Sequence, residues 1–485
     1  MSRCFVPALV GVTLVVSTIS SLGAPLVPSI ADSLSVSLSS AQWSLTSALL
    51  AGAVAAPILG RLGDGPHRRE AMLGALAVVT AGGLIAGAAG SLPVLVVGRS
   101  MQGVGLGMVP LAMAAARDHL PADRVAAVIG LLSVSGAAGL GAGYPISGLI
   151  AHHFDVHAAF VFGAAMSAGA LLATYLFVPS SRGTRSARLD LPSAAIGAFG
   201  LIALLVGVAQ GERWGWGSAA VLGCFALAAV VLTFWVQLQL RREMPLVDLR
   251  QLRHRAVLGA DMAAMLLGLA LYMFLSVVTE FVQTPPTEGF GFGATTLTAG
   301  LCLLPFSILS LLSSRVMSAM TRRIGTRAVL VFGAFAIFSS GVFCALVHDQ
   351  LWQAFLTMGL LGIGFGFTFA AIPGLITRSI PAGEVGSAMG FYQVIRSIGY
   401  AVGSALVATV LAGHEVSGSD FPAESGYMSA LWIGVAACVL AAAVAALLSP
   451  AGEGMPASEA TADLLRDDAE LASAGLIDAE VEPRR

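Results

Sequence analysis

Apolar runs long enough to cross a lipid bilayer recur along almost the whole chain. A membrane-spanning helix needs about 20 apolar residues, because each residue rises about 1.5 Å and the hydrocarbon core is about 30 Å thick. Charged residues make up only 11% of the chain, whereas a soluble protein carries about a quarter. Lipid is the solvent that accommodates such an excess of apolar surface. The sequence therefore predicts an all-α integral membrane protein.

Fourteen such runs can be distinguished, and the count falls to twelve if the pair 192–210 and 218–238 is left out. An N-terminal signal peptide is the alternative for the first run, but its length and the absence of a small-residue cleavage motif favour a retained helix. The predicted spans are 5–28, 42–60, 71–91, 93–115, 125–150, 158–178, 192–210, 218–238, 256–282, 294–317, 328–347, 351–376, 388–411 and 428–448.

Arginine is distributed unequally between the two sides of this predicted bundle. Arg68, Arg185, Arg253 and many others fall in alternate loops, whereas the loops on the opposite side contain Arg213 alone. Basic residues near span ends are retained on the cytoplasmic side. We therefore expect a multi-pass protein of the plasma (inner) membrane of a bacterium, with both termini in the cytoplasm.

A sequence repeat divides the chain into two similar halves. The glycine pattern of residues 103–107 recurs at 362–366, and each copy is followed by an arginine. Repeated halves are typical of transporters that bind their substrate near the membrane midplane. We predict a six-helix half at 1–180, two inserted helices at 181–245, a second six-helix half at 246–450 and a disordered acidic cytoplasmic tail at 451–485.

The loop between the second and third spans carries a compact motif. It runs from Gly60 to Asp64 and ends in Arg68 and Arg69. Glycines permit a tight turn, and we expect Asp64 to accept hydrogen bonds from the free amides at the start of the third span. The motif closely resembles the signature loop of the major facilitator superfamily, although His67 replaces a glycine of that pattern. This resemblance implies a gating loop; the alternative is an ordinary basic connector.

The fourth span contains a charged residue, Arg99, followed by Gln102 and a run of glycines. A buried arginine is expensive in lipid and is usually functional, while small residues allow a neighbouring helix to approach closely. The segment resembles a helix-four motif of the same superfamily, and the resemblance implies that Arg99 takes part in proton coupling. The alternative is that Arg99 only binds backbone carbonyl groups.

The fifth span is rich in glycine and includes Gly139, Gly143, Pro145 and Gly148. It resembles the antiporter motif of the exporters in this superfamily, but Tyr144 and Leu149 stand where that motif has glycine. Close helix packing alone is the alternative explanation. Together with the predicted number of spans, these motifs resemble the fourteen-span drug:proton antiporter branch over residues 5–450, which implies the major facilitator fold.

The first span lacks an acid that related antiporters commonly have at the position of Val16. The carboxyl groups that remain inside predicted spans are Asp261 and Glu280 in the ninth. We therefore predict, by elimination, that these two residues carry the proton, and we hypothesise that Arg99 and Glu280 communicate across the cavity when the outer side is closed. The alternatives are an interfacial Asp261 and a solvated Glu280.

The resulting functional prediction is a proton-coupled multidrug-type exporter of small hydrophobic or amphipathic compounds, working as a monomer. Export of a specific neutral or anionic metabolite and a non-transporting membrane sensor are the alternatives. The chain shows no enzyme motif, no metal or cofactor site and no basic face for nucleic acid, so the expected partners are a small molecule, protons and the bilayer. We assign four residues to a midplane substrate cavity: Gln102, Tyr272, Gln393 and Arg396.

Overall fold

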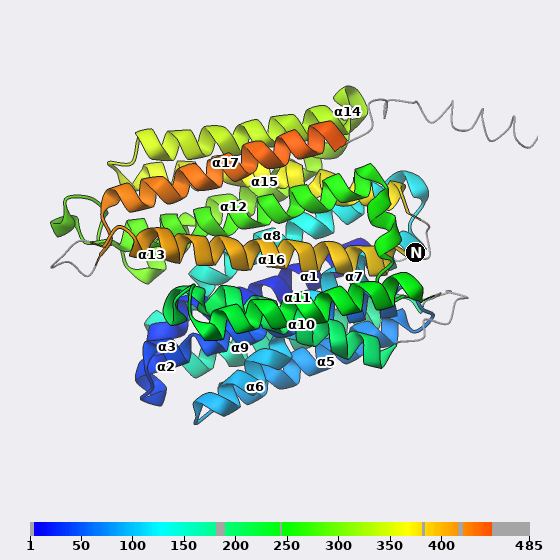
Figure 1. The fold of residues 1–485 in the computed structure, drawn as a ribbon, viewed down its shortest axis with the longest axis horizontal. Helices are drawn as coiled ribbons and strands as arrows, with labels where there is room; N and C mark the ends of the chain where they lie inside the picture. Colours follow the sequence, from blue (N-terminus) through cyan, green and yellow to red (C-terminus); the bar gives the residue numbers. More distant parts are fainter. Residues whose placement is uncertain (1–3, 181–189, 243–244, 381–383, 416–420, 449–485) are drawn as a thin grey trace, which may run out of the picture.

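The structure is a computed structural model that describes residues 4–180, 190–242, 245–380, 384–415 and 421–448. Within these residues the fold is helical, and long apolar helices lie nearly parallel to one another in a single bundle (Figure 1). Thirteen helices in the described part of the chain are long and apolar enough to cross a membrane, and a shorter apolar helix, α1 (Phe5–Ser21), precedes them. The predicted tail at 451–485 and the arginines at 182, 185 and 188 lie outside the described residues.

The spans follow the predicted order, and we keep the predicted division into a first half, an insert and a second half as names for groups of helices. The first half is built from α1, α4 (Trp43–Gly63), α5 (Arg68–Gly87), the broken span α6 (Leu92–Gly103), η2 (Val104–Gly107) and α7 (Met108–His119), then α8 (Ala122–His153) and α9 (Val156–Phe177). The insert is α10 (Leu191–Trp214) and α11 (Ala219–Arg241). The second half is α12 (Arg255–Gln283), α13 (Thr296–Cys302), α14 (Leu304–Leu346), α15 (Leu351–Arg378), α16 (Val385–Ala412) and α17 (Glu424–Leu448).

Short helices occupy the loops. They are α2 (Val27–Leu34), α3 (Leu38–Ala41) and the 3-10 turns η1 (Ala24–Leu26), η3 (Leu249–Arg253) and η4 (Pro286–Glu288).

The first predicted span, 5–28, is not one continuous α-helix. The α-helix ends at Ser21, a 3-10 turn that contains Pro25 follows, and α2 then continues from Val27. Proline lacks the amide that an α-helix needs in its interior, so the chain changes geometry there. Seventeen helical residues rise only about 25 Å, and the turn and α2 extend the segment further.

Two predicted spans are instead joined into the single long element α14. Its backbone departs from helical geometry only at Gly325, where φ is 81°. This left-handed backbone conformation favours glycine. Gly325 therefore forms the turn between the spans Thr296–Thr321 and Ala328–Leu346.

The inserted helices lie against both halves. Helix α10 packs on α4 of the first half and on α16 of the second half, and α11 packs chiefly on α10 (Figure 1). Helix α11 is buried on one narrow stripe, which includes Val221, Ala228 and Trp235. Most of its other apolar side chains are exposed and the rest are partly exposed, as expected for a helix that faces lipid. The insert therefore covers one seam between the halves.

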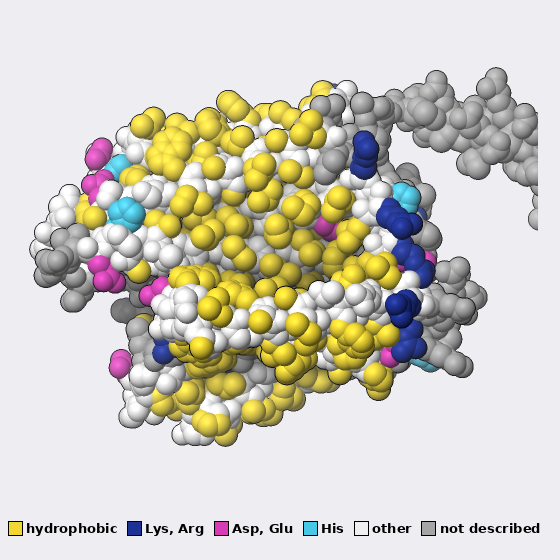
Figure 2. Space-filling view, in the orientation of Figure 1, with side chains coloured by type: hydrophobic (Ala, Val, Ile, Leu, Met, Phe, Trp, Pro, Cys, Tyr) yellow, Lys and Arg dark blue, Asp and Glu magenta, His cyan; other side chains and the backbone are white. Residues whose placement is uncertain are grey.

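The outer surface separates apolar from charged side chains. In Figure 2, hydrophobic side chains cover the long sides of the bundle, and most of the cationic side chains on this face gather at the end where Figure 1 marks the N-terminus. We call this the arginine-rich end; it holds Arg68, Arg117, Arg250, Arg253 and Arg323 at helix ends and turns. The other end, which contains Gln42, Glu212 and Trp214, is called the opposite end.

Candidate functional site

A central cavity of about 350 Å³ lies between the two halves. Helices α1, α4 and α8 of the first half, α12 and α16 of the second half, and α10 of the insert contribute to its wall. The lining extends from Arg396 in the middle of α16 to Gln42, Glu212 and Arg213 at the opposite end. This volume is within the range of cavities that hold small molecules.

The bundle is closed between this cavity and the arginine-rich end, because α4 and α16 touch there backbone to backbone. A Cβ atom added to Gly60 would clash with the carbonyl oxygen of Gly386 and lie 3.1 Å from the Cα atom of Gly390. A Cβ atom added to Gly390 would lie 2.8 Å from the carbonyl oxygen of Ala56. Glycine is therefore required on both helices for this closure.

Asp64 joins the same two helices. Its Oδ1 accepts a hydrogen bond from the amide of Gly386 at 2.7 Å, and its Oδ2 accepts one from the amide of Ser387 at 2.9 Å. These are free amides at the start of α16, where an anion is favoured. The prediction that Asp64 binds the start of the third span is therefore wrong in its partner: the amides belong to the other half of the protein.

The surroundings of Asp64 have two opposing effects on the pKa of its carboxyl group. Burial raises the pKa of its carboxyl group to about 6, while hydrogen bonds from Ser387 and Gly386 and the nearby charge of Arg61 act to lower it. The loss of hydration is thus the larger effect. A proton can therefore bind to this carboxyl group when the arginine-rich end is closed.

The arginine pair after Asp64 fixes the loop within its own half. Arg68 forms an ion pair with Asp118 at 2.9 Å and donates a hydrogen bond to the carbonyl of Gly63. Arg69 donates to the carbonyl of Tyr175 at 2.6 Å, and its guanidinium lies over the ring of the same residue. The two arginines hold the loop to α7 and α9, so that it presents Asp64 to α16.

Arg99 is fully buried at 0% exposure, and its partners all belong to the first half. Its guanidinium donates to the carbonyl groups of Ile19, Ser20 and Ser44 and, at 2.8 Å, to Oε1 of Gln102. This geometry agrees with the alternative hypothesis for Arg99, in which it binds backbone carbonyl groups. Gln102 is a partner of Arg99 and is not among the residues that line the central cavity.

The other three residues assigned to a substrate cavity line the central cavity: Tyr272, Gln393 and Arg396. Arg396 is 2% exposed. It donates to Oε1 of Gln393 at 2.6 Å and to Oγ of Ser133 at 3.4 Å. Ser133 lies on α8, so the guanidinium reaches from the second half to the first.

The glycines of the predicted antiporter helix lie at contacts on two sides of α8. Cβ atoms added to Gly139 and Gly143 would clash with α1, at the carbonyl groups of Leu14 and Thr18. One added to Gly148 would lie 3.1 Å from the Cα atom of Leu297 on α13. Pro145 is also at this contact, because a Cβ atom added to Gly300 would lie 2.9 Å from its nitrogen. Helix α8 therefore packs against α1 of its own half on one side and against α13 of the second half on the other.

The two predicted proton-carrying acids occupy different environments on α12. Asp261 is 4% exposed, and its Oδ1 has no hydrogen-bond partner among the described residues. Glu280 is exposed near the opposite end, within electrostatic range of the hydroxyl group of Tyr144, which lines the cavity. Neither acid is among the hydrogen-bond partners of Arg99 described above. Their role in proton coupling stays a prediction.

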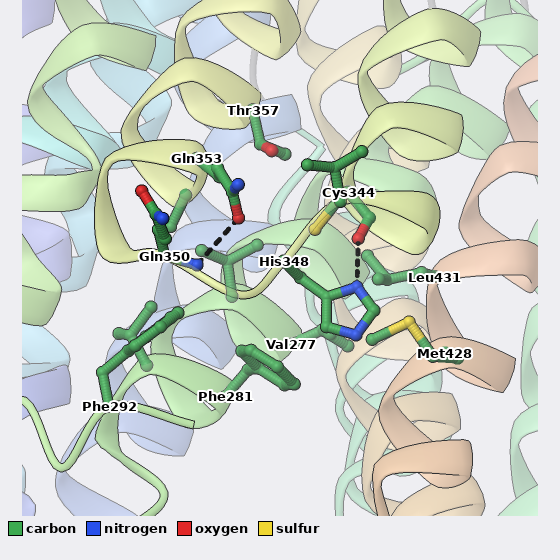
Figure 3. Close-up of a pocket in the computed structure, with 14 residues that line it drawn as sticks. Val277, Phe281, Phe292, Cys344, His348, Gln350, Gln353, Thr357, Met428 and Leu431 are labelled. Carbon is green, nitrogen blue, oxygen red and sulfur yellow. Dashed lines mark hydrogen bonds between the residues drawn. The ribbon is translucent and has the colours of Figure 1, made fainter. Parts of the chain in front are cut away.

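Two other cavities are less suited to a polar ligand. One lies among α12, α14, α15 and α17, where the ring of His348 points to the carbonyl of Cys344 at 3.0 Å beside Phe281 and Met428 (Figure 3). Its volume of about 10 Å³ corresponds to about one water molecule. The other, of about 390 Å³, lies where the insert meets α4 and α16 and is lined almost entirely by apolar side chains.

Gln210 and Tyr400 are among the residues of the central cavity wall that the sequence did not predict. Gln210 is 4% exposed and lies on the inserted helix α10, and its Oε1 has no partner among the described residues. The ring of Tyr400 packs against the ring of Tyr272 at a tilt of 34°, with ring centroids 5.1 Å apart. The signal for Gln210 is a single polar residue late in an apolar span, and the signal for Tyr400 is its position four residues after Arg396 on one helix face.

The comparisons with known proteins agree with this architecture. The family model for the Major Facilitator Superfamily matches residues 9–404. The chain is 27% identical over 389 residues to "Multidrug resistance protein Stp" of Mycobacterium tuberculosis, covering 79% of this chain and 71% of that protein. It is 28% identical over 445 residues to "Cephamycin export protein CmcT" of Amycolatopsis lactamdurans, covering 87% of each.

Among solved structures, the human organic anion transporter MFSD10 (TETRAN) has a similar fold, with a TM-score of 0.62 and 16% identity over 91% of this chain and 99% of that one. At this level of identity the likeness concerns the fold alone. The family match, by contrast, extends over most of the chain. The chain therefore belongs to the major facilitator superfamily, whose members are membrane transporters and not enzymes.

Proposed function

We propose that this protein is a secondary active exporter of small hydrophobic or amphipathic compounds that works by alternating access. One observation carries the proposal: the central cavity extends to the opposite end of the bundle, while α4 and α16 close the arginine-rich end. The bias of basic residues supports a cytoplasmic position of the arginine-rich end in a bacterial cell. The structure then corresponds to the outward-facing state, from which an exporter releases its substrate.

The direction of transport is supported by the relatives. Their names describe multidrug resistance and the export of an antibiotic. The glycine contacts of α8 with α1 and α13 support an antiporter. They bring α8 close to helices of both halves, and alternating access requires one half to rock against the other at such a contact. The cavity lies within one chain, so we expect the monomer to be sufficient for transport.

We further propose that protons drive the export and that Asp261 and Glu280 carry them. A buried carboxylate without a counterion is costly, so a change in its exposure during the cycle is expected to bind or release a proton. Asp261 fits this description because it is buried with one oxygen unpartnered. Glu280 is placed where protons from outside can reach it, near the opposite end of α12.

Transport into inverted membrane vesicles tests this proposal. An imposed pH gradient, acidic inside, should drive uptake of one or more compounds from a panel of cationic, neutral and anionic molecules. Glu280→Gln should retain substrate exchange but lose the response to pH; if it does not, Asp261→Asn should show that effect. Normal pH-driven uptake in both variants would exclude these acids as the proton carriers. No uptake of any compound, with the protein correctly inserted, would favour the membrane sensor instead.

A narrower candidate function is the export of a specific neutral or anionic metabolite. The observation in its favour is the arginine in the cavity wall, Arg396, together with the absence of an acid at the position of Val16 in the first span. The same vesicle assay distinguishes the two candidates. A multidrug exporter accepts several unrelated compounds, whereas a metabolite exporter accepts one chemical class.

A further inference from the structure

We infer that the central cavity binds small organic anions, with the negatively charged group of the ligand at Arg396 and its apolar body against the neighbouring aromatic and aliphatic side chains. This inference names the substrate class of the export proposed above and therefore rests on that function. The binding site itself is defined by side chains from α8, α12 and α16, independently of what drives transport.

The charge of the cavity wall is the first observation. Its charged lining residues are Glu212, Arg213 and Arg396. Glu212 and Arg213 are exposed at the mouth of the cavity and carry opposite charges. Together they contribute no net charge there. Arg396 lies deep in the cavity and is 2% exposed. The inner part of the cavity therefore carries one positive charge.

No carboxylate in the part of the chain that the structure describes forms an ion pair with this arginine. None of the ion pairs among the described residues includes Arg396. Its neighbours are the neutral oxygens of Ser133 and Gln393 and the rings of Phe369, Tyr392 and Tyr400, whose centroids lie 5.3 to 5.8 Å from the guanidinium carbon. Aromatic rings stabilise a cation without removing its charge. A buried arginine without an acidic partner is suited to bind an anion from outside the protein.

Hydrogen-bonding capacity is also left over beside this charge. Nε of Arg396 and the hydroxyl group of Tyr400 are buried and have no partner among the described residues. They lie four residues apart on α16 and therefore on the same face of the helix. Buried donors are normally satisfied, so two unsatisfied groups at one place indicate a ligand with acceptor oxygens, such as a carboxylate or a sulfonate.

The other residues of the cavity wall indicate which kind of ligand body fits beside the anionic group. The rings of Tyr272 and Tyr400 pack against each other on one side, and Leu49, Leu50 and Leu140 contribute apolar surface on α4 and α8. An aromatic or branched aliphatic body fits such a wall. A ligand with a positively charged group would instead be repelled by the charge of Arg396. It would also lose its water of hydration without gaining a carboxylate partner, because none lines the inner cavity.

The test is equilibrium binding to the purified full-length protein in lipid nanodiscs. Three probes share one aromatic body: naphthalene-2-carboxylate, its neutral carboxamide and the cationic naphthalen-2-ylmethylammonium. Titration calorimetry should show that the carboxylate binds at least tenfold more tightly than the carboxamide and that the ammonium compound binds most weakly. Tighter binding of the ammonium compound, or saturable binding of none of the probes, would overturn the inference.

Two variants assign the effect to the proposed residues. Arg396→Gln should remove the preference for the carboxylate over the carboxamide, and Tyr400→Phe, which removes only a hydroxyl group, should reduce it several-fold. Arg241→Gln is the matched control, because it removes an exposed arginine at the end of α11, away from the cavity; it should preserve the preference. An unchanged preference in well-folded Arg396→Gln or Tyr400→Phe would refute the assignment.

Binding and transport can fail separately. Selective binding of the carboxylate without uptake into inverted vesicles under any pH gradient would support the anion site and overturn proton-driven export. Gradient-driven uptake restricted to cationic compounds would support the export function and overturn the anion site.

Discussion

The contact between Gly60 and α16 provides a quantitative test of how the arginine-rich end closes. In Gly60→Ala, the new methyl group would overlap the carbonyl oxygen of Gly386 and crowd Gly390 at 3.1 Å. Both obstacles are backbone atoms, so the helices must separate to relieve the overlap. Overpacking of this kind costs about 1–3 kcal/mol, and the cost arises only in the closed state.

A free-energy change of this size has a large effect on a two-state equilibrium. It lowers the ratio of the closed to the open arginine-rich end by a factor of about 5 to 150. Spin labels at positions 70 and 253, which are exposed at that end on the two halves, report the change by pulsed electron resonance. The distance distribution should shift towards longer distances, and the transport rate should fall because the outward-facing state is depopulated.

Gly74→Ala is the matched control for this experiment. It is the same chemical change on α5, where no atom lies within 4 Å of the added Cβ atom, and it brings the same gain in helix propensity. The control should retain the distance distribution and the transport rate of the unmodified protein. If Gly60→Ala also retains both, the close contact between α4 and α16 does not govern closure, and the reasoning is refuted.

Three further predictions concern the gate, the buried arginine and the topology. The pKa of Asp64 is about 6 when the arginine-rich end is closed, against an ordinary 3.8. The closed state therefore binds the proton more tightly than an open state in which Asp64 is hydrated. Closure is favoured at low pH, and this stabilisation is lost as the pH rises through about 6. Asp64→Asn should remove this pH dependence of the spin-label distance and lower the transport rate of every substrate equally, and a change of substrate preference at a normal rate would contradict it. Arg99→Ala should abolish gradient-driven transport, because it leaves buried carbonyl groups of Ile19 and Ser20 without their donor; vesicle uptake at the normal rate would disprove this. In a cysteine-free background, a cysteine at position 213 should react with a membrane-impermeant thiol reagent added outside intact cells and one at position 185 should not, and labelling of position 185 would reverse the topology.

The order of the spans was predictable because it depends on local composition. Runs of apolar residues identify helices in lipid whatever their neighbours are, since each backbone group must be satisfied within its own helix. The same rule does not describe the ends of helices. The turn at Pro25 shortens α1, and the left-handed backbone of Gly325 separates two spans in a continuous helical element, because both depend on individual residues and not on average hydropathy.

The candidate site was predictable only in part. Tyr272, Gln393 and Arg396 could be assigned to the cavity because polar residues inside a span must face the interior of the bundle. Gln102 satisfies the same rule by binding Arg99, so polarity alone does not separate a cavity residue from a buried partner. Gln210 was missed, because nothing in the sequence shows that the inserted helix α10 lies beside the cavity.

The sequence by itself determined a membrane-embedded helical bundle with one arginine-rich side and predicted two related halves with an insert, since these properties follow from hydropathy, charge and repetition along the chain. Only the tertiary structure decided which groups meet. Asp64 follows the second span, and its partners, the amides of Gly386 and Ser387, are more than three hundred residues away in the other half. Arg396 likewise has its first-half partner on α8, and among the described residues no acid forms an ion pair with it. Such pairings depend on how whole helices pack, and helices of similar composition can pack in many ways, so the local sequence does not specify them.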